Sequence, residues 1–292
     1  MGIDFLTDHL VEEYESMPKR LRVAARFVLD HPKEVALMSM RQQARQAGVS
    51  HTTMVRLANW LGLGSYDDLR AFYFQALDGP VQPLKNTALR KTGSANGKEI
   101  HLVGQLAKTY AAQTASIADP DTATRLQSAA KLLAKSDRLF CMGQRSAYTI
   151  ARHFTLVMSD FRENLILLDM TGGVGIDSIH RAGQGDALLA IGFAPYDRAT
   201  IETAQNALRR SITVIAITDS RVSPLVRLAR ESIVVATNSQ SFFQSMTPAV
   251  SAIEVLAALI AKRSTANVNE MSEKNISLKG IIVMSHSTRS KS

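Results

Sequence analysis

Four polar side chains that lie close together in the sequence have the chemistry needed to contact nucleic acid: His51, Thr52, Thr53 and Arg56. Imidazole, hydroxyl and guanidinium groups donate hydrogen bonds to phosphate oxygens and to acceptor atoms on base edges. The four residues fall within the first turn and a half of a predicted helix and outside its apolar stripe. The N-terminal residues of such a helix are the ones that meet base edges in the major groove, so this spacing predicts a DNA-reading surface.

Two short helices joined by a tight turn would hold these side chains in place. Gly48 can adopt the positive φ that such a turn requires, and the Ser50 hydroxyl can cap the helix that follows. Apolar residues recur at helical spacing and predict the buried face of that helix: Val55, Leu57, Ala58 and Leu61. The stretch 44–62 is therefore interpreted as a helix-turn-helix.

Basic residues gather around this stretch. The chain has a formal net charge of +8. Residues 16–58 hold eight basic residues against two acidic ones. The basic residues are Lys19, Arg20, Arg22, Arg26, Lys33, Arg41, Arg45 and Arg56. Segregated charge of this kind is typical of a phosphate-binding surface, although a solvated helical face gives similar counts. The predicted DNA-binding set is Arg41, Arg45, Ser50, His51, Thr52, Thr53 and Arg56.

Length and composition indicate the class of protein in which these motifs occur. The chain has 292 residues, which favours two domains, and its 46% hydrophobic and 21% charged residues indicate an ordinary globular protein. No leader pattern and no apolar stretch of spanning length is evident, so we expect a cytoplasmic, nucleoid-associated protein without a membrane segment. The single cysteine, Cys141, lies in an apolar run and predicts a buried, inert thiol.

The first part of the chain, residues 1–77, is predicted to be all helix. Helices are expected at residues 4–14 and 18–30, after Pro32, through the helix-turn-helix, and at 65–77. Trp60 is expected to pack between these helices. Residues 78–100 are rich in Gly, Pro and Lys and predict a linker, either a solvated tether or a segment that touches DNA phosphates.

The region 101–263 alternates helical patterns with short apolar runs. The runs predict strands at 138–142, 165–168, 187–193, 212–218 and 232–236. Helices are predicted at 102–117, 122–134, 148–160, 175–181, 200–210, 223–230 and 242–262. This alternation predicts a second, α/β domain with a doubly wound parallel sheet, whose ligand crevice lies beyond the carboxyl ends of the strands. Residues 264–292 are interpreted as a polar tail.

Three loops at strand ends could form a ligand pocket. They are residues 143–148, 192–200 and 217–224. Gly143 allows close approach of the backbone, and Ser146 presents a hydroxyl at a helix start, where anions bind. Three polar loops at one edge of a sheet predict a pocket, whereas the alternative for each loop by itself is a turn with a cap.

The chain resembles the RpiR/MurR-type bacterial transcriptional regulators. The resemblance rests on residues 49–57 and 61–69 of the helix-turn-helix, and on residues 143–146, 217–220 and 223–225, which are similar to the sugar isomerase (SIS) domain of that family. It implies a cytoplasmic, oligomeric DNA-binding regulator whose SIS domain senses a small metabolite, often a phosphosugar. A homodimer or homotetramer would bind double-stranded operator DNA.

One loop departs from the pattern that the resemblance implies. Phosphosugar-binding SIS domains usually carry a Ser-x-Ser-Gly-x-Thr-type loop after the strand that is predicted here to end at Phe193, and only Thr200 is retained. We expect an anionic or polar metabolite held by Ser146, Arg145 and Thr200, with Arg198 either pairing with Asp197 or reaching the ligand. The predicted ligand-binding set is Gly143, Arg145, Ser146, Tyr196, Asp197, Arg198, Thr200, Thr218 and Ser220.

An isomerase is the alternative function, because SIS domains also occur in enzymes. Aldose–ketose isomerisation needs a general base, and the candidates are Glu202, His180 and Glu254, each in an ordinary helical pattern. The seven histidines show no metal-ligand spacing, and neither a metal nor a cofactor is predicted. We therefore expect no enzymatic activity. Oligomer contacts are expected on residues 242–262 and 102–117, for which a buried core explains the apolar stripes equally well.

Overall fold

The computed structural model describes residues 3–76, 95–159, 161–169, 177–239 and 241–263. The chain divides into two compact units. The first contains Met1–Gln113 with Thr218–Arg227 and Val234–Ser245, and the second contains Thr114–Ile217, Leu228–Ile233 and Met246–Ser292. Residues 78–94 of the predicted linker and all of the predicted tail lie outside the described residues. The prediction of a linker at residues 95–100 is wrong, because these residues form the start of helix α7 (Ala95–Ala115).

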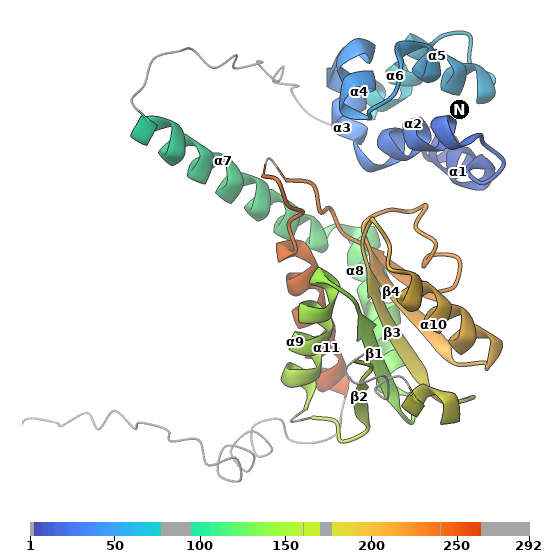
Figure 1. Ribbon diagram of the computed structural model, residues 1–292, viewed down its shortest axis with the longest axis vertical. Coiled ribbons are helices and arrows are strands. Elements are labelled where there is room, and N and C mark those ends of the chain that lie inside the picture. The colour runs from blue at the N-terminus through green and yellow to red at the C-terminus, as the bar shows by residue number, and fades with distance from the viewer. Residues whose placement is uncertain (1–2, 77–94, 160, 170–176, 240, 264–292) are drawn as a thin grey trace, which may run out of the picture. The chain divides into compact units, whose positions relative to one another are not determined.

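Six helices form the N-terminal bundle (Figure 1). They are α1 (Ile3–Glu13), α2 (Lys19–Asp30), α3 (Pro32–Leu37), α4 (Met40–Gln46), α5 (His51–Trp60) and α6 (Tyr66–Gln75). Their apolar stripes meet in one core in which Leu10, Val28, Met54, Leu57 and Leu69 are fully buried. Pro32 begins α3, where its missing N–H costs no hydrogen bond.

The turn between α4 and α5 has the predicted geometry. Gly48 has a φ of 67°, and the Val49 N–H donates to the Ala44 carbonyl at 2.9 Å, which closes the end of α4. The Ser50 hydroxyl accepts from the Thr53 N–H at 3.2 Å and caps α5. The prediction of a helix-turn-helix at 44–62 is confirmed.

The prediction for Trp60 is wrong. Its side chain is 41% exposed instead of packed between helices. The buried face of α5 consists of Met54, Leu57 and Ala58 and continues to Leu61 beyond its end. Trp60 lies about 100° around the helix from Leu61, on the side away from Ala58, and therefore falls outside this stripe.

The described residues from Ala95 onward contain five strands and further helices, of which α7 belongs up to Gln113 to the first unit. The strands are β1 (Leu139–Gly143), β2 (Leu165–Leu167), β3 (Ala187–Gly192), β4 (Thr213–Thr218) and β5 (Glu231–Val234). The helices are α7 (Ala95–Ala115), η1 (Ser116–Ala118), α8 (Pro120–Ala134), α9 (Ser146–Met158), η3 (Asp177–Arg181), α10 (Arg198–Arg209) and α11 (Thr247–Arg263). All five residues of β1 and all six of β3 are buried, as expected for strands covered on both faces.

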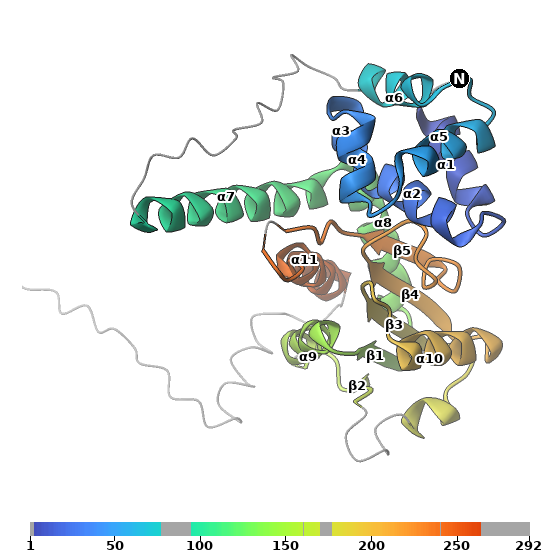
Figure 2. The ribbon, with the colours of Figure 1, turned by 45° about the horizontal axis from the view of Figure 1, so that its top comes forward.

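The strands form one parallel sheet in the order β2-β1-β3-β4-β5. From β1 the chain moves outward through α9 to β2, and from β3 it moves the other way through α10 to β4. Because both crossovers are right-handed, the reversal puts α9 and α10 on opposite faces of the sheet (Figures 1 and 2). The predicted doubly wound α/β fold is confirmed, and its topological switch point lies between β1 and β3.

Some of the predicted helices differ from the structure. Residues 223–230 form turns instead of a helix. The Ser223 hydroxyl accepts from the Leu225 N–H at 3.3 Å, and this local bond competes with helical bonds. The last helix begins at Thr247, not at residue 242, and Phe242 is 98% exposed.

Arg138 and Asp186 tie together the starts of β1 and β3, at the edge opposite the ligand crevice. Arg138 donates to the Asp186 carboxylate through Nε at 3.0 Å and through Nη2 at 2.7 Å. The Gly183 N–H adds a further bond at 2.8 Å. Burial raises the pKa of Asp186, but the hydrogen bonds from Arg138 and Gly183 outweigh burial, so the pKa of this carboxyl lies below its ordinary value.

Replacing Asp186 by asparagine is expected to lower the free energy of unfolding by about 2 kcal/mol at neutral pH. Because the folded-state pKa is depressed, the carboxylate stabilises the fold above the unfolded-state pKa. This contribution disappears as the pH falls through the folded-state pKa. Urea unfolding followed by circular dichroism should therefore show a difference between the two proteins that shrinks below a pH of about 4. Glu163→Gln, at an exposed position, is the control, and a difference independent of pH would contradict the prediction.

Candidate DNA-binding face and ligand site

The predicted DNA-binding residues lie on two consecutive helices. Arg41 and Arg45 are exposed on α4, one helical turn apart, and His51, Thr52 and Arg56 are exposed on α5. In a helix-turn-helix the first helix crosses the DNA backbone while the second enters the major groove. These five predicted DNA-binding side chains of α4 and α5 are accessible to solvent, and Ser50 and Thr53 are described next.

Ser50 and Thr53 have a structural task within the predicted set. The Ser50 Oγ and the Thr53 Oγ1 are 2.9 Å apart and hydrogen-bonded, in addition to the cap on α5. Thr53 is half-buried. These two residues fix the start of α5. His51, Thr52 and Arg56 are the donors of the predicted set that face outward from this helix.

Ion pairing separates the basic residues of this region into two groups. Arg22 pairs with Glu15 at 2.9 Å, and Arg26 pairs with Asp30 at 3.1 Å. Within the described part of the chain, Arg41, Arg45 and Arg56 form no such pair. Among the described residues, the exposed Lys19, Arg20 and Lys33 of α2 and α3 likewise form no ion pair, so unpaired basic residues lie both on the helix-turn-helix and on the helices before it.

The predicted ligand edge begins where β1 and β3 end side by side. Gly143 of β1 pairs with Ile191 of β3, so the loops that follow the two strands leave the sheet together at the switch point. Gly143 is buried, and a side chain there would collide with the Ala147 carbonyl. Its role in the structure is close packing of the strand end against α9.

Arg145 has a strained backbone at the start of α9. Its φ is 57° and its ψ is −126°, and α9 begins there without a side-chain cap. Strain of this kind costs of order 1–3 kcal/mol and gathers at functional sites. Arg145 and Ser146 are both exposed. The Ala147 and Tyr148 N–H groups at the start of α9 donate to the Gln144 and Arg145 carbonyls, both at 3.1 Å, and the Ser146 hydroxyl is left at the predicted ligand edge.

The loop after β3 differs from the predicted arrangement. The Asp197 Oδ1 accepts from the Ala199 N–H at 2.9 Å and from the Thr200 N–H at 3.3 Å, so Asp197 caps α10. Arg198 is 90% exposed and pairs with Glu202, one turn along the helix, at 2.7 Å. The predicted alternative in which Arg198 pairs with Asp197 is wrong, because the carboxylate faces the amides of α10.

The remaining predicted ligand residues are mostly enclosed. Thr200 is 1% exposed, and among the described residues its hydroxyl has no hydrogen-bond partner. Thr218 and Ser220 are fully buried. The Thr218 hydroxyl donates to the Ser223 Oγ at 2.8 Å, and the Ser220 hydroxyl donates to the Asp30 Oδ1 at 2.7 Å. Tyr196 is half-buried.

The three candidate general bases lie on separate elements. Glu202 of α10 accepts from Arg198, and Glu254 of α11 lies 3.0 Å from the Nε2 of His153. His180 is exposed on η3. Among the residues that the structure describes, no three His, Cys, Asp or Glu side chains gather in a way that could hold a metal ion. Cys141 is buried, and burial raises the pKa of its thiol.

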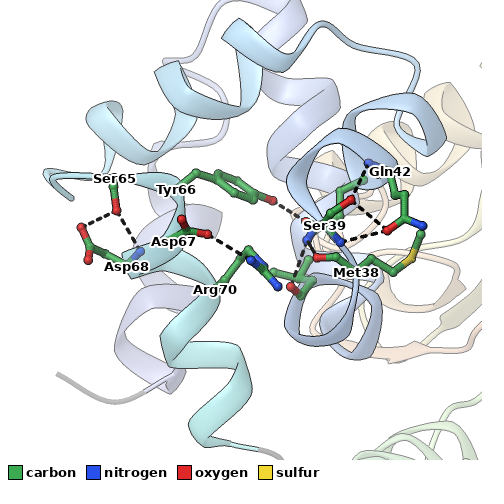
Figure 3. Close-up of polar contacts among 10 residues, drawn as sticks. Met38, Ser39, Gln42, Ser65, Tyr66, Asp67, Asp68 and Arg70 are labelled. Carbon is green, nitrogen blue, oxygen red and sulfur yellow. Dashed lines mark hydrogen bonds and ion pairs between the residues drawn. The ribbon is translucent and has the colours of Figure 1, made fainter. Parts of the chain in front are cut away.

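Two positioning features of the helix-turn-helix were not predicted from the sequence. Ser39 and Gln42 form a reciprocal capping box at the start of α4, whose signature is a serine followed three residues later by glutamine. Gln43 is fully buried and accepts the Tyr66 hydroxyl at 2.6 Å. Figure 3 shows Tyr66 of α6 pointing toward α4, beside the Ser39–Gln42 box. The sequence signal that could have identified Gln43 is a polar residue inside the apolar stripe of a predicted helix.

Family models match both parts of the chain. The helix-turn-helix domain of the rpiR family matches residues 6–78, and the SIS domain matches residues 132–259. No described helix combines the length and the apolar character that crossing a membrane requires.

Solved structures share the fold at low sequence identity. The NanR protein of Vibrio vulnificus, complexed with ManNAc-6P, is 19% identical with a TM-score of 0.51, covering 94% of this chain and 97% of its own. The sugar isomerase domain of an RpiR transcription factor from Sphaerobacter thermophilus is 19% identical with a TM-score of 0.51, covering 61% of this chain and 94% of its own. The c3406 protein of E. coli CFT073 is 13% identical with a TM-score of 0.51, covering 64% of this chain and 100% of its own.

The order of the two domains is as informative as either domain alone. A helix-turn-helix of the rpiR type precedes a SIS domain in one chain, and the two matched regions together span most of it. The chain belongs to the RpiR/MurR-type family of helix-turn-helix proteins with a C-terminal SIS domain.

Proposed function

We propose that this protein is a metabolite-responsive transcriptional regulator that binds operator DNA through α4 and α5. The observation that carries the proposal is the set of exposed arginines, Arg41, Arg45 and Arg56, on a helix-turn-helix that is joined to a ligand-binding type of domain. Arg41 and Arg45 bind phosphates, whereas His51, Thr52 and Arg56 contact base edges.

The effector binds at the carboxyl edge of the sheet, between the loops that follow β1 and β3. The strained backbone of Arg145 and the exposed Ser146, both at the start of α9, support this location. The effector is a small polar metabolite of the sugar or sugar-phosphate class. The complex of NanR with ManNAc-6P supports that class, since the two proteins share a fold.

The regulator acts as a homo-oligomer on a palindromic operator in the cytoplasm. Apolar residues of α11 such as Ile253, Leu256 and Ile260 are buried in the core. Ile100 and Val103 of α7, by contrast, are 68% and 67% exposed. This difference favours α7 over α11 as the oligomer contact. The effector changes the distance between the two reading helices of a dimer and thereby changes DNA affinity.

An isomerase or a metabolite-binding protein without a regulatory role is the second candidate, favoured by the SIS domain itself. The two candidates differ in DNA binding. Selection from a random DNA library with the full chain, followed by fluorescence anisotropy, should yield a sequence that binds more tightly than random DNA. Failure to enrich any sequence would favour the second candidate. Thermal-shift screening with phosphosugars, free sugars and sugar acids then identifies the effector.

Replacing Ser146 by alanine is expected to remove the effector response and to leave DNA affinity within about twofold of the wild type. Ser146 is exposed at the start of α9 and far in sequence from the reading helix, so losing its hydroxyl removes a ligand contact without altering α5. Anisotropy titrations with and without the effector measure both quantities. Ser159→Ala, at the other end of α9, is the control. A loss of DNA affinity in the Ser146 variant without ligand would contradict this division of roles.

A further inference from the structure

Residues 218–227, which follow β4, are bonded to helices α1 and α2. Both sides of this contact belong to the first compact unit. The Ser220 hydroxyl donates to the Asp30 Oδ1 at 2.7 Å, and the Arg26 Nη2 donates to the Asp219 Oδ2 at 2.9 Å. Two consecutive residues of a predicted ligand loop, Asp219 and Ser220, are thereby bound to the end of α2.

The centre of this contact is enclosed. The side chains of Asp219 and Asp30 are 5% and 20% exposed, and Ser220 is fully buried. Arg26 joins the two carboxylates, because its Nε also donates to the Asp30 Oδ2 at 3.1 Å. Burial raises the pKa of the Asp30 carboxyl, although the hydrogen bonds from Ser220 and Arg26 act in the opposite direction. Removing one of these groups leaves its partners enclosed without compensation.

Exposed ion pairs flank this centre. Arg221 pairs with Asp8 of α1 at 3.3 Å, and Arg227 pairs with Glu15, which follows α1. Such exposed pairs contribute little to stability. They match in sign with the contact at the centre, and complementary charge of this kind fixes the register of two surfaces. The segment after β4 is therefore held on α1 and α2 in one defined position.

The Ser220 hydroxyl is a group that the predicted ligand loop and α2 share. It has one donor proton, and Asp30 accepts it. Its oxygen accepts from the Val222 N–H at 3.3 Å, and the Thr218 hydroxyl donates to the Ser223 Oγ at 2.8 Å, so the loop is also bonded within itself. An effector that accepts a hydrogen bond from Ser220 therefore has to displace Asp30.

α2 in turn belongs to the core that holds the predicted reading helix, α5. Val28 of α2 and Leu57 of α5 are fully buried in the same cluster, and the two helices pack against each other. A displacement of α2 therefore acts on α5 through closely packed side chains. β4 lies beside β3 in the sheet, so its loop leaves from the carboxyl edge that is proposed to bind the effector.

We propose that the effector and Asp30 compete for the loop that follows β4, so that effector binding releases α2. The proposal rests on the proposed function, because it uses the effector location given there. One hydroxyl proton serves either acceptor but not both, so the contact with α2 and the contact with the effector exclude each other. Breaking the contact by substitution therefore changes DNA affinity in the way that the effector does.

A double-mutant cycle in DNA binding tests the proposal with the full chain and without effector. Asp30→Ala removes the acceptor on α2, and Ser220→Ala removes the donor on the loop. Each substitution is expected to change the affinity for the selected DNA by at least about fivefold, both in the same direction. The double variant should show the change of one single variant, because all three proteins lack the same contact. Fluorescence anisotropy measures the affinities.

Two controls separate this effect from unfolding. Trp60 fluorescence in urea shows whether the helical domain of each variant is folded at the assay temperature, and Asp30→Asn or Asp219→Asn replaces a variant that is not. Asp67→Ala is the matched control. Asp67 pairs with Arg70 inside α6 at 3.0 Å, so this substitution removes a carboxylate–guanidinium pair and leaves the bonds of Asp30 unchanged. Its DNA affinity should stay within about twofold of the wild type.

The outcomes distinguish this proposal from the proposed function. Single variants that bind the selected DNA like the wild type overturn the competition, and so do changes of opposite direction. Changes that add in the double variant also overturn it, because Asp30 and Ser220 would then act separately. A wild type that selects no DNA sequence refutes the regulator proposal itself. A wild type that selects DNA while the cycle shows no coupling refutes only the competition.

Discussion

Replacing Arg56 by alanine is expected to weaken the binding of the selected DNA by ten- to a hundredfold, because a specific base contact is worth about 1–3 kcal/mol. Arg56 is exposed on α5, one turn after Thr52, and no described acid pairs with it. The loss should be the same with and without effector, since the contact belongs to the DNA-bound state. Anisotropy titrations over a range of salt concentrations measure it.

The salt dependence tells a base contact from a phosphate contact. If Arg56 reads a base, the variant should lose preference for the selected sequence over random DNA and keep the salt slope. If it binds a phosphate, the affinity for both DNAs falls together and the slope decreases by about one. Arg152→Ala, an exposed arginine on α9, is the control. An Arg56 variant that binds the selected DNA like the wild type would exclude α5 as the reading helix.

Local signals explain why the sequence predicts the helix-turn-helix well. Gly48 and Ser50 act through their own backbone and the next few residues, so the turn and the cap follow from residue type alone. The buried strands β1 and β3 were likewise predictable, because a strand covered on both faces reads as a continuous apolar run.

The predictions failed where a side chain had two available partners. Asp197 could pair with Arg198 or cap α10, and only the orientation of the loop after β3 decides between them. Residues 223–230 had a helical pattern but form turns, and the Ser223 hydroxyl accepts from the Thr218 hydroxyl and from the Leu225 N–H. Residue types and spacing do not decide between such partners, because the choice depends on the backbone conformation that each loop adopts.

Gln43 is a buried polar residue that connects the helices around the helix-turn-helix. Its Nε2 donates to the Val35 carbonyl at 3.0 Å and to the Met38 carbonyl at 2.8 Å, and its Oε1 accepts from Tyr66. Burial raises the pKa of Tyr66, which keeps its hydroxyl protonated as the donor. One side chain thereby links α4 to the end of α3 and to α6.

Replacing Gln43 by leucine is expected to destabilise the helical domain by about 3–5 kcal/mol. The leucine leaves two carbonyls and one hydroxyl buried without partners, and each such group costs of order 1–3 kcal/mol. Trp60 is the only tryptophan and lies in α5, so its fluorescence during urea unfolding reports on this domain. Tyr66→Phe removes a single hydroxyl from the same network and should cost about 1–2 kcal/mol, which makes it the graded control.

The Gln43 and Arg56 variants should fail in DNA binding for different reasons. Gln43→Leu lowers the folded fraction of the helical domain, so lower temperature should partly restore its DNA binding. Arg56→Ala removes a contact from a folded surface, so temperature should not restore the lost preference for the selected sequence. A Gln43 variant as stable as the wild type would mean that α4 is positioned by the apolar core alone. The proposal that Gln43 positions α4 and α5 while Arg56 contacts the DNA would then be wrong.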